Sequence, residues 1–197
     1  RASRQLSLAL AAPLSDEDQT VQPMDDASPT KWHLAHTTWF YESFILKPHL
    51  PDYREFSPDF EYCFNSYYES KGERQPRGRR GLLTRPSAQQ VRAYRAYVDE
   101  ALTELFARGF VDEGPDPLAV LIELGINHEQ QHQELLLTDI LSLFAAQPLR
   151  PAYRDPNPKR EPVEATAAAE YIRFDGGIRS IRAVCGECRR QVPRGFL

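Results

Sequence analysis

Cysteine is scarce in this chain of 197 residues, which holds only Cys63, Cys185 and Cys188. So few cysteines cannot form the disulfide framework that stabilises small secreted proteins. A reducing compartment fits this composition best, and we expect a cytoplasmic protein. Cys185 and Cys188 form a single CxxC, which does not establish a zinc or redox site without a second pair or a βαβ context.

Long apolar runs and an excess of positive charge are also lacking. No run approaches the length needed to cross a bilayer. Residues 1–14, in which Arg1 and Arg4 precede an apolar run, resemble a signal peptide, but we interpret them as a first amphipathic helix. The net charge of −4 argues against a nucleic-acid partner held by phosphate neutralisation. The charge is unevenly spread, since the last twenty residues carry five arginines against one glutamate.

Strand patterns are absent from the first 150 residues, which instead show helix start and stop signals. Ser28 and Pro29 predict a helix from Pro29 to about Leu46, stopped by Pro48. A capping box at residues 87–90 opens the next helix, and Gly109 ends it. Asp116 and Pro117 open a long helix that runs to about residue 146. The sequence therefore predicts an all-α fold with a long aperiodic loop at residues 50–85.

The predicted long helix carries His128 and His132, which lie four residues apart. Residues at this spacing share one helix face, so both imidazoles can reach one metal ion. Two hydrogen-bonded core histidines are the alternative. The run His128-Glu129-x-x-His132 also matches the zinc-protease motif, in which Glu129 would be the general base. That interpretation needs a third ligand downstream, where no histidine follows and the nearest suitable glutamates, Glu161 and Glu164, fall in a Pro-rich segment.

A third imidazole is available upstream, on the helix predicted to begin at Pro29. His36 shares a face with Trp32 and Trp39, while His33 lies one turn earlier within reach of the same side, and spacing alone does not choose between them. Three imidazoles contributed by two helices are a common metal site in helical bundles. Such a donor set suits Fe(II), Zn, Ni or Cu.

Four motifs, in the same order along the chain, resemble the ergothioneine-biosynthesis sulfoxide synthases, and in particular their amino-terminal DinB-like helical domain. The likeness covers about residues 10–153 and 171–178. The motifs are Ser28–Phe40, Phe64–Tyr68, Arg80–Pro86 and Asn127–Glu134.

The resemblance implies a DinB-like four-helix bundle that holds a mononuclear non-haem Fe(II) through His36, His128 and His132. Members of this family use O₂ to join a thiol, either cysteine or γ-glutamylcysteine, to trimethylhistidine. By spacing, Arg77 and Arg80 match the arginines that hold the carboxylate of the thiol substrate. His33 would then be a packing residue or would support the metal ligands from outside.

The resemblance also implies a division of the chain. Residues 1–150 would form the bundle and residues 151–170 a Pro-rich linker. Residues 171–197 would be the start of a second, formylglycine-generating-enzyme-like domain, followed by an irregular, atypical tail. The family's second domain supplies most contacts to trimethylhistidine, so we expect a truncated chain and incomplete catalysis. A frameshift would explain the change of charge near the end.

Two other functions compete with this interpretation. One is a DinB-like thiol transferase that uses zinc and no O₂, and the other is a non-catalytic bundle that its metal merely stabilises. A related enzyme with the same architecture as the sulfoxide synthases, but one that transfers selenium, is a further alternative.

Overall fold

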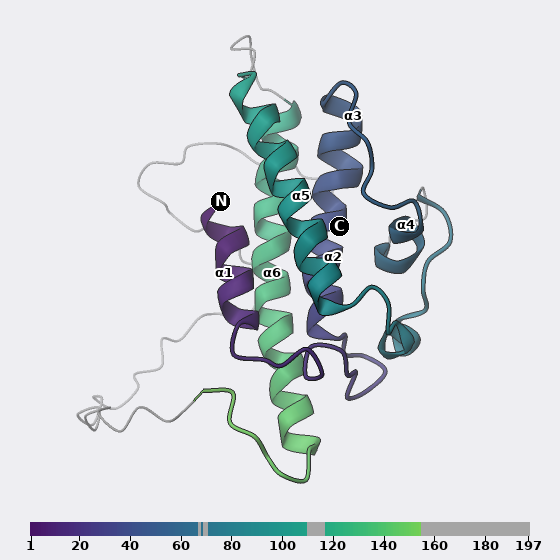
Figure 1. Cartoon of the computed structure of the whole chain (residues 1–197), viewed down its shortest axis with the longest axis vertical. Coiled ribbons are helices and arrows are strands. Elements are labelled where there is room, and N and C mark those ends of the chain that lie inside the picture. Colours follow the sequence, from purple (N-terminus) through teal and green to yellow (C-terminus); the bar gives the residue numbers. More distant parts are fainter. Residues whose placement is uncertain (67, 69–70, 110–116, 155–197) are drawn as a thin grey trace, which may run out of the picture. The chain divides into compact units, whose positions relative to one another are not determined.

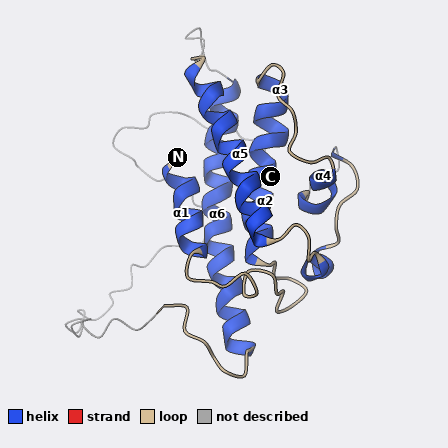
Figure 2. Cartoon of the chain, viewed as in Figure 1, coloured by secondary structure: helices blue, strands red, loops and turns tan. Residues whose placement is uncertain are grey.

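The structure is a computed structural model that describes residues 1–66, 68, 71–109 and 117–154. These residues belong to one compact unit, Arg1–Pro156. They form helices and connecting loops without a strand (Figure 2), so the predicted all-α fold is confirmed. No helix in this part of the chain combines the length and apolar character needed to cross a membrane. Several predicted features lie outside the described residues: most of the linker, the tail from residue 171, and the Cys185–Cys188 pair.

The helices follow one another in the order shown in Figure 1. The bundle is built from α1, α5, α6 and a long rod that comprises α2 and two short continuations. The elements are α1 (Ala2–Ala11), α2 (Thr30–Tyr41), the π-helical segment η1 (Glu42–Leu46), α3 (Lys47–His49), α4 (Asp59–Phe64), the 3₁₀ segment η3 (Arg77–Leu82), α5 (Ala88–Ala107) and α6 (Pro117–Ala146).

The rod that begins with α2 runs parallel to α5 and antiparallel to α6 (Figure 1). At the start of both α2 and α5, Lys31 Nζ donates to the carbonyl of Pro86. Two neighbouring helices that run parallel need a connecting segment that passes back along the whole length of the bundle. The predicted aperiodic loop is this crossover, and it carries the short elements α4 and η3.

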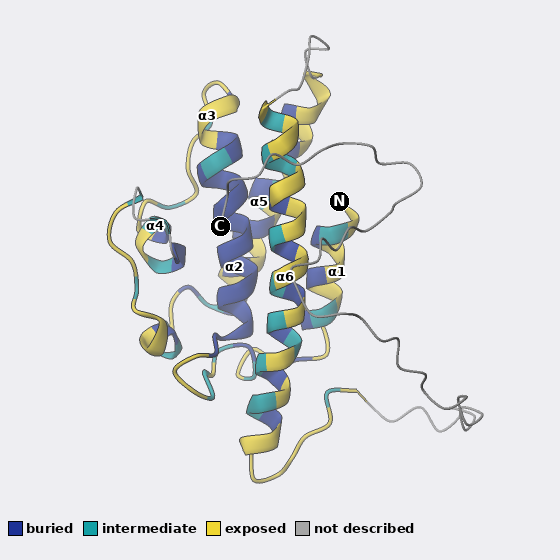
Figure 3. Cartoon of the chain, turned by 180° about the vertical axis from the view of Figure 1, so that it is seen from behind, coloured by how far each residue is buried: buried dark blue, intermediate teal, exposed yellow. Residues whose placement is uncertain are grey.

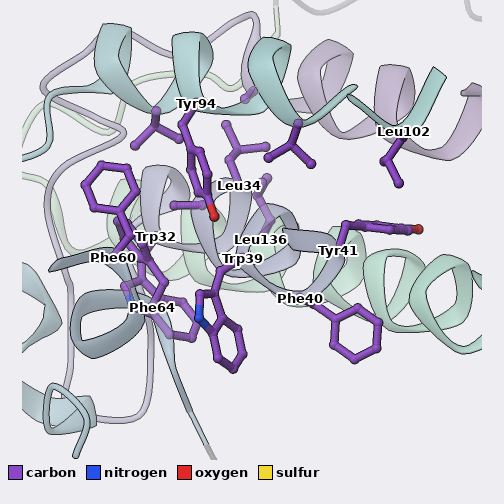
Figure 4. Packing of buried hydrophobic residues seen from close by; sticks show 14 of the residues in the cluster. Trp32, Leu34, Trp39, Phe40, Tyr41, Phe60, Phe64, Tyr94, Leu102 and Leu136 are labelled. Atoms are coloured by element: carbon purple, nitrogen blue, oxygen red, sulfur yellow. The ribbon is translucent and has the colours of Figure 1, made fainter. Parts of the chain in front are cut away.

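Helix α2 is the centre of the bundle. Helices α1, α4, α5 and α6 all pack against it, and each of its twelve residues is buried, as the continuous dark blue of Figure 3 shows. Its large side chains, among them Trp32, Trp39, Phe40 and Tyr41, form much of the core in Figure 4. Because α2 has no exposed polar face, the hydrophobic pattern of its sequence does not show which of its residues point toward which neighbouring helix.

The end of the rod differs from the prediction. The sequence placed a stop at Leu46 before Pro48, but the helix widens into a π-turn over Glu42–Leu46 and continues to His49. Proline has no N–H for the carbonyl four residues earlier, and its ring clashes with that carbonyl in a regular helix. The wider turn accommodates Pro48 without ending the rod.

The predicted capping signals have different outcomes. The capping box at Ser87 and Gln90 is present, and Gly109 follows α5 with a φ of 79°, as expected of a glycine after a helix end. Ser28 does not cap α2. Its hydroxyl instead accepts a hydrogen bond of 2.9 Å from Arg80.

Gly125 allows α6 to approach α2 closely. A Cβ at this position would lie 2.9 Å from Cε1 of Tyr41 and 3.1 Å from Cε1 of Phe40. Both rings belong to the buried core. The absence of a side chain at Gly125 therefore sets how near the two helices lie.

We predict that Gly125→Ala destabilises the fold. Alanine is the better helix former by about 1 kcal/mol, but overpacking a well-filled core costs about 1–3 kcal/mol. Urea unfolding should show a net loss of stability. The same change should cost less in a Tyr41→Ala background, where one of the two obstructing rings is gone. A Gly125→Ala variant more stable than the parent would contradict the close approach.

Candidate metal centre

Three imidazoles meet between α2 and α6. His36 comes from α2, and His128 and His132 come from successive turns of α6. One ring nitrogen from each lies within 4.8 Å of the other two. Their ring centroids are 4.7 to 4.9 Å apart. The structure thus brings together the three predicted ligands, and the group could hold a metal ion.

The orientation of His36 is determined by its surroundings. Its ring stacks on Trp32 at a centroid distance of 4.6 Å, and Trp39 stacks on it at 5.6 Å. The Nδ1 atom lies 2.6 Å from the carbonyl oxygen of Phe64. A carbonyl can only accept, so Nδ1 carries the proton and Nε2 presents a lone pair. That Nε2 lies 3.2 Å from Nε2 of His128.

Burial keeps the three imidazoles uncharged. It lowers the pKa of His128 to about 4. Burial, together with the nearby His128, puts the pKa of His36 well below its usual value. Burial and the neighbouring histidines likewise lower the pKa of His132. At neutral pH the group therefore consists of neutral imidazoles, which is the form that binds metals.

The nitrogen positions fit a shared ion. Two nitrogens bound to one metal at about 2.1 Å lie roughly 3–3.4 Å apart, and the two Nε2 atoms of His36 and His128 are separated by 3.2 Å. The Nδ1 atom of His128 is buried and has no hydrogen-bond partner. Two nitrogen lone pairs directed at one point repel each other unless a proton or a cation lies between them.

His33 lies beside this group and contacts it from outside. Its Nδ1 is 2.9 Å from Nδ1 of His132, and its Nε2 is 2.9 Å from Oδ2 of Asp139. Asp139 was not singled out in the sequence. The available signal was its position seven residues after His132, which places it on the same face of a helix.

The two predicted substrate arginines differ in environment. Arg80 is buried, and its guanidinium carbon lies 3.4 Å from the ring centroid of Trp32. It donates to Ser28 and to Ser66. Arg77 is exposed. Both line a surface hollow of about 610 Å³ that also includes Arg74.

Comparison with known families places the histidines within a recognised domain. A sequence profile described as the DinB superfamily matches residues 1–136, a range that includes all three histidines of the group. The chain belongs to the DinB superfamily. Proteins of this superfamily bind metals, in agreement with the group of imidazoles described above. No curated protein matches the chain.

Glu129 of this DinB-superfamily chain is directed away from the histidines. It is fully buried and pairs with Arg95, and it also lies 3.4 Å from Arg4 and accepts a hydrogen bond of 2.7 Å from Ser7. Burial by itself raises the pKa of this carboxyl, but the charges of Arg95 and Arg4 more than compensate and hold it below its usual value. A carboxylate with these partners is a structural anion rather than the general base of a zinc protease.

We predict that Glu129→Gln destabilises the fold and leaves metal binding intact. Removing one charge of a buried ion pair leaves its partner uncompensated, at a cost of about 3–5 kcal/mol. Urea unfolding measures this loss, and Co²⁺ titration of the folded variant measures binding. Glu134→Gln, an exposed position on the same helix, is the matched control and should change stability by less than about 0.5 kcal/mol. An unchanged stability for Glu129→Gln would contradict the assigned role.

Proposed function

We propose that this chain is the metal-binding domain of a non-haem iron(II)- and O₂-dependent enzyme that joins a thiol to trimethylhistidine. The observation that carries the proposal is the convergence of His36, His128 and His132 without a carboxylate in the group. If His36, His128 and His132 held an iron ion, three neutral nitrogens would not fill its coordination sphere, and oxygen-activating sites require such open positions. When bound, Fe(II) would supply the one-electron and O₂ chemistry that side chains lack.

The surface hollow supports the choice of a thiol that carries a carboxylate, such as cysteine or γ-glutamylcysteine. Arg74, Arg77 and Arg80 all border it, and guanidinium groups bind carboxylates in a bidentate manner. Arg80 also stacks on Trp32, which in turn stacks on the ligand His36. We infer that Arg77 contacts the substrate carboxylate. Arg80 would instead keep Trp32 in position between the hollow and the three histidines.

The same three imidazole nitrogens would also hold zinc. Two other functions therefore compete with this proposal. A zinc-dependent thiol transferase would bind the thiol without O₂. A non-catalytic bundle would bind a metal but no thiol.

The half-buried Cys63, a free thiol, accords with the reducing, cytoplasmic setting that we propose for the protein.

We predict that a divalent ion binds to the purified protein and that His128→Ala or His132→Ala abolishes this binding. Each change removes one of three converging nitrogens. Isothermal titration with Co²⁺ or anaerobic Fe²⁺ measures the effect. His49→Ala is the control, because His49 is exposed on α3. Retention of stoichiometric metal by both site variants would refute the assignment of the ligands.

The proposed activity predicts a spectral response to the thiol. Anaerobic addition of cysteine or γ-glutamylcysteine to the Fe(II)-loaded protein should produce a thiolate-to-iron absorption band. Arg77→Ala should raise the thiol concentration that gives half of the change. A thiol-induced spectral change with the cobalt form, but no O₂ consumption with iron, thiol and trimethylhistidine, would favour the transferase. No response with any metal would favour the non-catalytic bundle.

A further inference from the structure

A chain of hydrogen-bonding groups extends outward from His132 to the start of α2. Nδ1 of His132 contacts Nδ1 of His33 at 2.9 Å, and Nε2 of His33 contacts Oδ2 of Asp139 at the same distance. The same Oδ2 accepts a hydrogen bond of 2.8 Å from the backbone N–H of Ser28. His33 is buried, and the side chain of Asp139 is only 12% exposed.

The chemistry of these groups gives the chain a direction. A backbone N–H can only donate, so Oδ2 of Asp139 acts as an acceptor toward Ser28. A carboxylate oxygen also accepts from His33, which places the proton of His33 on Nε2. Neutral His33 then has a lone pair on Nδ1, which must accept from Nδ1–H of His132. His132 is left with its lone pair on Nε2, the only ring nitrogen not used in this chain.

We propose that Asp139 and His33 are positioning residues that select the Nδ1–H tautomer of His132 and hold its Nε2 lone pair toward the metal site. This inference rests on the proposed metal centre and adds two residues that set the protonation pattern of one ligand. His36 is controlled in the same sense by the Phe64 carbonyl. His128 has no such partner.

Both α2 and α6 contribute residues to this chain of hydrogen bonds. Asp139 lies on α6 seven residues beyond His132, while His33 lies in the first turn of α2 and the Ser28 amide just before that helix. The Ser28 N–H also donates to Asp139 Oδ2, so the carboxylate does not depend on His33 alone for its position. Outer hydrogen bonds of this kind orient ligand histidines and increase their basicity.

Metal affinity tests the positioning role. We expect His33→Phe, which keeps a ring against Trp32 but removes both hydrogen bonds, to weaken Zn²⁺ or Co²⁺ binding roughly tenfold to hundredfold in competition with a chelator. Asp139→Asn should weaken it less, because an amide oxygen still accepts. The double variant should bind no more weakly than His33→Phe, since Asp139 acts through His33. Glu134→Gln is the control on the same helix. Affinities within twofold of the parent for both single variants would overturn the proposal.

The tautomers provide a test that needs no metal and no activity. Long-range ¹H–¹⁵N spectra of the metal-free parent protein should show His132 protonated on Nδ1 and His33 on Nε2. In His33→Phe the signal of His132 should shift toward the Nε2–H form. A parent protein with His132 protonated on Nε2 would overturn the proposal. An absence of thiol binding or O₂ consumption would refute the proposed function alone, because these spectra do not depend on either.

Discussion

The close approach of α2 and α6 is the constraint on which the rest of the structure depends. Along this antiparallel seam, residues of α2 and of the segment just before it contact residues of α6 in opposite chain order. Without a Cβ at Gly125 the helices lie near enough for imidazoles to face one another directly. From one end of the seam to the other, the meeting pairs are Tyr41 with Gly125, His36 with His128, His33 with His132, and Ser28 with Asp139.

Two adjacent residues of α6, His128 and Glu129, point toward different neighbouring helices and have different polar roles. His128 faces α2, where burial favours the neutral ring, while Glu129 faces α1 and α5, where Arg95 and Arg4 favour the ionised carboxylate. Consecutive helical residues point about 100° apart, so each group can have an environment suited to it. The group of three histidines stays free of negative charge, and the network of Glu129, Arg95 and Arg4 joins α6, α5 and α1.

The crossover between α3 and α5 contributes to the centre although it contains little regular structure. Glu42 in the π-turn is buried and accepts hydrogen bonds from the hydroxyls of Tyr53 and Tyr94 and from the backbone N–H of Phe56. Anchored in this way, the crossover brings the Phe64 carbonyl to His36 and stacks a guanidinium on Trp32. A buried carboxylate with several donors is a stable anchor because its desolvation is compensated.

The sequence by itself determined what acts over a few residues of chain. The capping box at Ser87, the glycine after α5 and the two histidines on one face of α6 all follow from local helix geometry. The tertiary structure alone decided which groups from distant segments meet. Because α2 is buried all round, periodicity could not tell His36 from His33, and no local rule links either one to α6. The roles of Glu129, Asp139 and the Phe64 carbonyl likewise depend on packing between helices, since each acquires its partner from a segment far away in the chain.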